Sequence, residues 1–102
     1  DTAYLIGALS DGGCYYLKYK GGRTEYRCVW TQKNVEWLKQ SIIPRINRIS
    51  EKHGIKVAIK LYKGTTRYEV RVSSKDFYSY IVEAAKQIRH AINECNIDIV
   101  KL

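Results

Sequence analysis

Apolar residues along this chain recur either at every second position or at helical spacing, and the two patterns follow one another in blocks. Glycines separate the blocks at Gly12-Gly13, Gly21-Gly22, Gly54 and Gly64, where helix ends and turns are expected. In chain order, the pattern predicts a helix over 3–11, strands near 15–20 and 24–32, a helix over 34–52, strands over 55–62 and 66–72, and a helix over 75–94.

The alternation also assigns strand residues to the two faces of a sheet. In the second strand, Tyr26, Cys28 and Trp30 share the side that we expect to face the core. The first strand is ambiguous, because either of two sets could face inward: Tyr15, Leu17 and Tyr19, or Tyr16, Lys18 and Lys20. We expect Leu17 to point inward, with the tyrosine hydroxyls at the sheet edge.

The order of the elements predicts a single α+β domain over residues 1–102, with an αββαββα core. Its four strands would form one antiparallel sheet, with the helices on one face and solvent on the other. A weak internal repeat agrees, because residues 24–34 and 66–76 each run from a strand through a capping segment into a helix. Pro44 lies inside the long helix and should kink it, because proline has no N–H to donate to the Gln40 carbonyl.

Charge gives the solvent-facing side of this sheet a candidate role. The chain has 18 Lys and Arg against 10 Asp and Glu, a formal net charge of +8, which favours a polyanionic partner. The open face would carry Arg23, Arg27, Lys56, Lys60, Arg67 and Arg71, with Glu25, Glu69, Thr31 and Thr65 among them. A two-stranded ribbon fits the DNA major groove, where Arg pairs with guanine and Glu accepts from cytosine. The interleaved glutamates indicate base readout or orientation of the arginines; the alternative is an ordinary solvated face with cross-strand ion pairs.

Other classes of protein receive less support. Cys14, Cys28 and Cys95 show no CxxC spacing and only two histidines are present, so we expect three reduced thiols and no zinc site. No apolar run approaches the roughly 20 residues of a membrane span, and no signal peptide is visible, so we expect a cytoplasmic protein without membrane contact.

The first helix carries the candidate chemistry. Ala3, Gly7 and Asp11 are spaced i, i+4 and i+8, with Ser10 beside them, as a stripe of small residues that ends in a carboxylate. Small residues at this spacing let two helices approach closely, so Ala3, Gly7 and Ser10 are candidate interface residues. Two such helices would bring two Asp11 carboxylates together into an oxygen-rich site for a hard divalent metal. The alternative is a plain helix that ends in an Asp-Gly turn.

The run from Tyr4 to Gly13, a motif helix over 3–13, resembles the LAGLIDADG motif of archaeal intron-encoded homing endonucleases. Further stretches resemble the N-terminal half of monomeric members, among them Leu17 to Gly21, Glu25 to Arg27, Thr31 to Lys33, Lys63-Gly64, Thr66 to Glu69 and Arg71 to Lys75. The resemblance implies the αββαββα fold and metal-dependent, site-specific cleavage of double-stranded DNA, with Mg²⁺ or another hard cation such as Mn²⁺ or Ca²⁺.

The resemblance also implies roles for individual residues. Asp11 would bind the metal with help from the Ser10 carbonyl, Gln32 would orient water and metal, and Lys33 would reach a phosphate or the water network. The sheet face would lie along the major groove, with Arg23, Glu25, Arg27, Arg67, Glu69 and Arg71 reading bases. From the residue pattern, we add to these predicted DNA-contacting residues Thr31, Lys56 and Lys60 of the open face and Tyr15 and Tyr19 of the first strand. One motif per chain implies a homodimer or a second LAGLIDADG half. The alternative function is an RNA maturase of this type or a nucleic-acid-binding protein that does not cut.

Overall fold

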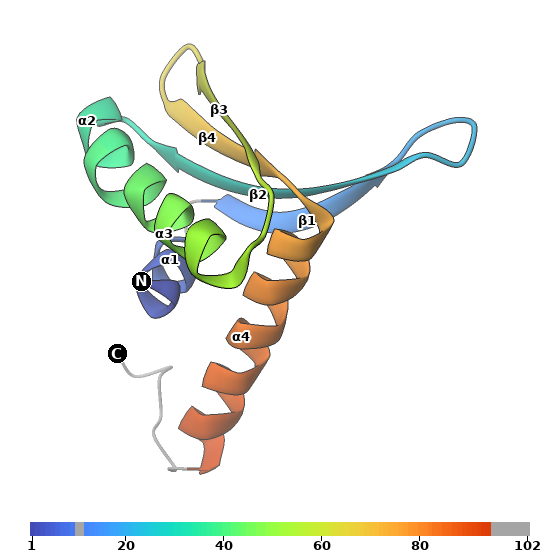
Figure 1. Ribbon diagram of the computed structural model, residues 1–102. Coiled ribbons are helices and arrows are strands. Elements are labelled where there is room, and N and C mark those ends of the chain that lie inside the picture. The colour runs from blue at the N-terminus through green and yellow to red at the C-terminus, as the bar shows by residue number, and fades with distance from the viewer. Residues whose placement is uncertain (10–11, 95–102) are drawn as a thin grey trace.

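The computed structural model describes residues 1–9 and 12–94, and Figure 1 shows how their elements are arranged. The elements are α1 (Thr2–Ala8), β1 (Gly12–Lys18), β2 (Thr24–Gln32), α2 (Val35–Trp37), the π-helical turn η2 (Leu38–Ile42), α3 (Ile43–His53), β3 (Ala58–Lys63), β4 (Tyr68–Ser73) and α4 (Lys75–Glu94). This is the predicted αββαββα order, with the long second helix divided into three parts.

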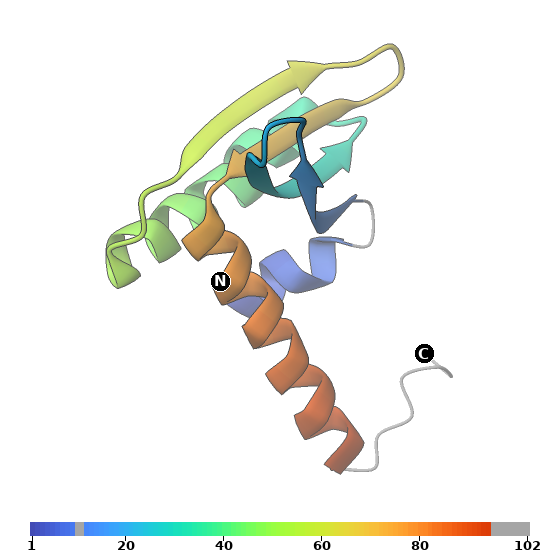
Figure 2. The same cartoon turned by 90° about the vertical axis from the view of Figure 1, so that its right-hand side faces the viewer.

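The strands form one antiparallel sheet in the order β1-β2-β4-β3, so β2 and β4 are central. Each outer strand pairs with its neighbour in sequence, through the β1–β2 and β3–β4 hairpins. In Figures 1 and 2 the helices all lie on one side of the sheet. The predicted four-stranded sheet with helices on one face is therefore confirmed.

The core lies between the sheet and these helices. Trp30 is fully buried on β2, and Val70 and Val72 supply the buried side chains of β4. Opposite them pack apolar residues from the helices, namely Leu5, Leu38, Ile42, Ile46, Ile49, Phe77 and Ile81. Burial of this apolar surface is the main stabilising term for a domain of this size.

The motif helix is shorter than predicted. It ends at Ala8, and Gly12 and Gly13 are not its C-terminal stop, because they open β1. Gly12 pairs with Trp30 of β2, and a Cβ at Gly12 would run into the Val29 carbonyl. This glycine is therefore required by a close approach of two strands.

The region around Pro44 departs from an α-helix in a specific way. A kink was predicted there, and the structure contains a π-helical turn directly before the proline, in which the Ile43 N–H donates to the Leu38 carbonyl. Such turns widen the hydrogen-bond ring where a partner is missing. Asn34 caps the N-terminus of α2, because its side chain accepts from the backbone N–H groups of Glu36 and Trp37 at 3.1 and 3.2 Å.

Strand faces follow the sequence pattern in β2, β3 and β4 but not in β1. Leu17 pairs with Glu25 and Tyr15 pairs with Arg27, so this set lies on the open face. The expectation that Leu17 points inward was wrong. Cys14, on the other set, lies against the buried Cys28 and packs on the core.

Candidate functional site

The open face of the sheet collects most of the predicted DNA-contacting residues. Outward positions on the four strands hold Tyr15, Glu25, Arg27, Thr31, Lys60, Glu69 and Arg71. Arg23 and Tyr19 lie in the β1–β2 hairpin, Lys56 precedes β3, and Arg67 precedes β4. The sheet thus brings together residues spread over more than half of the chain.

Glu25 is the centre of one cluster on this face. Its carboxylate accepts hydrogen bonds from the Tyr19 hydroxyl at 2.7 Å, from Arg27 Nη2 at 3.0 Å and from the Ser73 hydroxyl at 3.0 Å. These three donors come, in the same order, from the β1–β2 hairpin, from β2 and from β4. The Tyr19 and Arg27 hydrogen bonds are the main reason why the pKa of Glu25 falls from 4.5 to about 2.

Glu69 and Arg71 form a second cluster with a similar arrangement. Arg71 Nε donates to Glu69 Oε2 at 2.8 Å, and the Arg71 guanidinium lies over the ring of Tyr62 at 4.3 Å. In the first cluster Arg27 lies over Tyr15 at 5.9 Å. Each central strand therefore carries a Glu-x-Arg pair, and each arginine also contacts a tyrosine from the adjacent outer strand.

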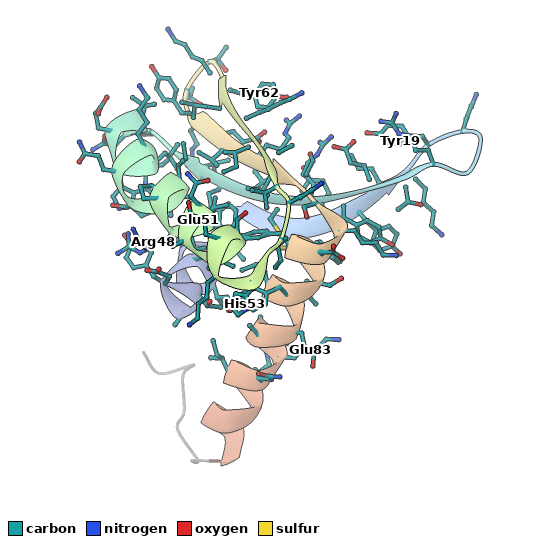
Figure 3. All side chains as sticks on the ribbon, viewed as in Figure 1. Tyr19, Arg48, Glu51, His53, Tyr62 and Glu83 are labelled. Carbon is teal, nitrogen blue, oxygen red and sulfur yellow. The ribbon has the colours of Figure 1, made fainter. Side chains whose placement is uncertain are left out.

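Two hairpins extend the face at its ends. The β1–β2 hairpin turns through Gly21 and Gly22, both at positive φ, and projects beyond the sheet in Figure 1. Arg23 lies over the Tyr19 ring at 4.9 Å in this hairpin. Figure 3 shows Tyr19 on the projecting hairpin and Tyr62 near the β3–β4 turn, far from each other.

The β3–β4 turn borders a groove of about 340 Å³ on the open face. Its walls come from Thr31, Tyr62, Lys63, Thr65, Arg67, Glu69 and Arg71, among others. The sequence analysis placed most of these residues on the open face but left Tyr62 out of the candidate site. The alternation of β3 already put Tyr62 on the same side as Lys60, so that signal was available. Ser73 was missed because its contact with Glu25 crosses from β4 to β2.

The motif helix α1 is attached to the underside of the sheet. Trp30 Nε1 donates to the Leu5 carbonyl at 3.0 Å, inside the core. Thr2 Oγ1 lies 2.8 Å from the Tyr80 hydroxyl of α4, and Tyr4 accepts from Trp37 Nε1 at 3.1 Å. Ala3 and Gly7 are exposed, and a Cβ at Gly7 would meet nothing within 4 Å. The predicted interface face of this helix is therefore uncovered in the described part of the chain.

The predicted catalytic residues are only partly within the described residues. Asp11 and Ser10 lie outside them. Gly12, which follows Asp11, pairs with Trp30, so the start of β1 lies beside the end of β2 that carries Gln32 and is followed by Lys33. The Gln32 side chain accepts from the Lys33 N–H at 2.9 Å, and Lys33 is exposed.

Among residues 1–9 and 12–94, no cluster of three or more His, Cys, Asp or Glu side chains could hold a metal ion. Asp11, the predicted metal ligand, lies outside these residues.

No helix in the described part of the chain combines the length and the apolarity needed to cross a membrane. No family model matches the chain.

Comparison with curated proteins identifies one relative of known activity. Over 89 residues the chain is 47% identical to the homing endonuclease I-DmoI of Desulfurococcus mucosus, a match that covers 86% of this chain and 46% of I-DmoI. The chain thus spans about half the length of this relative.

Solved structures of I-DmoI also match this chain, in sequence and in fold. I-DmoI bound to DNA and Mn matches at 47% identity with a TM-score of 0.81, covering 86% of this chain and 50% of that one. I-DmoI with DNA and Ca gives the same identity and TM-score, over 86% of this chain and 47% of that one. A variant of I-DmoI with its target DNA in the presence of Mg matches at 48% identity and a TM-score of 0.81, covering 86% of this chain and 50% of that one. In sequence and in fold, this chain is a relative of an archaeal LAGLIDADG homing endonuclease and corresponds to about half of it.

Proposed function

We propose that this chain is one half of a site-specific, metal-dependent endonuclease that cuts double-stranded DNA. The observation that carries the proposal is the open sheet face, where paired Glu and Arg side chains lie on both central strands of a fold shared with DNA-bound I-DmoI. I-DmoI is named as a homing endonuclease, and its structures contain DNA with Mn or Ca. A net charge of +8 suits a phosphate-rich partner.

The open face would lie along the major groove, and its arginines would contact base edges or phosphates. Arg27 and Arg71 are held by Glu25 and Glu69, so less side-chain entropy is lost when they bind. Because the Glu25 oxygens already accept from three side chains, we assign this residue to orienting Arg27 and Tyr19 rather than to reading cytosine. This choice supports one of the two roles that the sequence left open for the glutamates.

The uncovered face of α1 would receive a second motif helix. Ala3 and Gly7 leave room for a close helix contact, and the relative is about twice as long as the part that matches. The second helix would come from another copy of this chain or from a second, non-identical half. The symmetry of the cleaved DNA site distinguishes the two, because a homodimer reads a near-palindrome.

In the assembled enzyme, Asp11 of one half and an acid of the other would hold Mg²⁺, Mn²⁺ or Ca²⁺, with the Ser10 carbonyl as a further ligand. A divalent ion bound between two carboxylates supplies activated water and stabilises charge at the leaving oxygen. Gln32 would orient the attacking water, and the exposed Lys33, directly after β2, would reach a phosphate.

Cleavage of a randomised duplex DNA library in Mg²⁺ tests this proposal. The chain as given is compared with Asp11→Asn and with the control Glu83→Gln, which removes an exposed carboxylate from the middle of α4 (Figure 3). If two copies of this chain form the enzyme, we expect a discrete cleaved site with the chain and with the control. The Asp11→Asn variant should bind the same site without cutting it.

Two results would overturn the proposal. One is cleavage that persists in Asp11→Asn or in the presence of a chelator, because the acid and the metal would then be dispensable. The other is tight binding of structured RNA in preference to duplex DNA, which would identify the alternative, an RNA maturase. Binding of a discrete DNA site without cleavage by the unchanged chain would exclude the homodimer, and it would leave a non-identical second half or a binding protein that does not cut.

A further inference from the structure

Two cysteines whose spacing in the sequence matches no known motif lie side by side in the fold. Cys14 on β1 and Cys28 on β2 are direct cross-strand partners, on the face of the sheet that packs against the helices. Their sulfur atoms lie 2.7 Å apart, closer than sulfur atoms in ordinary packing contact. Both are free thiols.

The strand register also gives their backbones the separation that a disulfide needs. Tyr19 N–H donates to the Arg23 carbonyl at 2.8 Å, which marks this pair as hydrogen-bonded. Hydrogen-bonded and non-hydrogen-bonded pairs alternate along an antiparallel ladder, so Cys14 and Cys28 form a non-hydrogen-bonded pair. In such pairs the Cα atoms are about 4.5 Å apart, within the range of about 4.4–6.8 Å found in disulfides.

One of the two thiols can be reached from solvent. Cys14 is partly exposed and lines a cavity of about 220 Å³ together with Leu9 and Ile81, while Lys86 and Arg89 also border it. Cys28 is fully buried. The hydrogen bond between the two thiols lowers the pKa of Cys14, although burial acts in the opposite direction. The same hydrogen bond and burial both raise the pKa of Cys28. Cys14 is therefore the thiol that reacts first.

We propose that Cys14 and Cys28 are a redox-active dithiol, a site of reversible disulfide formation with small anionic disulfides such as oxidised glutathione. The Cys14 thiolate attacks one sulfur of the oxidant, forms a mixed disulfide and releases the first glutathione as a thiolate. Cys28 passes its proton to the released glutathione thiolate, attacks Cys14 Sγ and displaces the second glutathione. Two protein thiols are oxidised and one glutathione disulfide is reduced to two thiols. Lys86 and Arg89 attract the carboxylates of the oxidant to the cavity.

The disulfide would join β1 to β2 from the side opposite the proposed DNA-contacting face. It would leave Tyr15 and Arg27 unobstructed and would fix the strand that begins directly after Asp11. The inference does not rest on the proposed function, because it concerns only the two thiols and their surroundings.

Thiol–disulfide exchange with oxidised and reduced glutathione tests the proposal in a Cys95→Ser background, which leaves two thiols. We expect the folded protein to lose both thiols and two hydrogens in mass, to retain no glutathione, and to yield a peptide linking Cys14 to Cys28. The effective concentration of the two thiols should be on the order of a hundredfold higher in the folded protein than in denaturant, as a disulfide closing a loop of about 15 residues would give. Adding Cys28→Ser should leave one glutathione attached to Cys14.

Three results would overturn the proposal. The folded Cys95→Ser protein could keep both thiols in the oxidising buffer, it could retain glutathione on Cys14 without closing the disulfide, or its effective concentration could equal that of the denatured chain. The last comparison needs no change at Cys14 or Cys28, so it holds even if Cys28→Ser fails to fold.

Discussion

At the scale of single residues, the open face shows how a carboxylate can serve a basic surface. Glu25 lies among Tyr19, Arg27 and Ser73, and its hydrogen bonds fix the direction of the Arg27 guanidinium. A charge-assisted hydrogen bond of this kind is stronger than a neutral one and keeps the donor in one position. Removing the Glu25 charge should therefore affect both the stability of the chain and the order of its neighbours.

The pH dependence of stability tests the Glu25 cluster. The folded pKa of about 2 lies below the ordinary value of 4.5, so the ionised carboxylate stabilises the fold above pH 4.5 and this contribution is lost as the pH falls towards 2. The gap in unfolding free energy between the unchanged chain and Glu25→Gln, measured by urea denaturation, should be constant above pH 4.5 and shrink below it. Glu36→Gln is the control, since the exposed Glu36 carboxylate lies 4.0 Å from the exposed Lys39 ammonium. A gap that does not narrow in acid would contradict the assignment.

Two neighbouring glycines make a second residue-scale test. A Cβ at Gly12 meets the Val29 carbonyl carbon at 2.8 Å, whereas a Cβ at Gly13 meets nothing within 4 Å. We expect Gly12→Ala to lower the unfolding free energy by about 1–3 kcal/mol, because the strands must move apart. Gly13→Ala should change it by less than about 1 kcal/mol. Urea denaturation of both variants measures the difference, and equal costs would show that the close approach is absent.

At the scale of elements, α1 depends on its neighbours. A helix of seven residues is too short to be stable alone, so its tertiary contacts must hold it in place. The buried hydrogen bond from Trp30 Nε1 to the Leu5 carbonyl ties it to β2, and the contact between Thr2 and Tyr80 ties it to α4. The position of the chain that leads to Asp11 therefore follows from the core.

Replacing the indole tests this attachment. Trp30→Phe removes the donor to the Leu5 carbonyl and some buried volume, and we expect it to cost about 2–4 kcal/mol of unfolding free energy. Trp37→Phe is the matched control, because it removes an indole that donates to the exposed Tyr4 hydroxyl, and it should cost about 1 kcal/mol or less. Denaturant titration gives both values. If the two variants lost equal stability, the buried bond would not be what holds α1.

At the scale of the whole molecule, the two faces of the sheet differ in chemistry. One side buries the apolar residues against the helices, and the other presents paired charges to solvent. The protruding β1–β2 hairpin and the β3–β4 turn extend the charged side at its ends (Figure 1). A long duplex would meet this side as one continuous surface.

The salt dependence of DNA binding tests which side meets the duplex. Lys60→Ala on the open face should reduce the slope of log affinity against log salt by about 1, because one phosphate contact and its released counterion are lost. Lys52→Ala removes the same charge from the end of α3, away from the open face, and should leave the slope unchanged. Fluorescence anisotropy over a series of salt concentrations measures both. A larger effect at Lys52 would place the duplex on the helical side.

The sequence by itself determined the order of the elements, the inner and outer faces of β2, β3 and β4, and the resemblance to one half of a homing endonuclease. These features are local, because hydrophobic periodicity and short motifs depend on neighbours along the chain. The same periodicity placed Tyr62 on the outer side of its strand, although Tyr62 was not among the predicted DNA-contacting residues.

Only the tertiary structure decided the face of Leu17, the early start of β1 at Gly12, the partners of Glu25 and the meeting of Cys14 with Cys28. Each depends on the register between strands, and a shift of one residue would exchange the two faces. Register is set by pairing between distant segments and by core packing, which the spacing of residues along one strand does not specify.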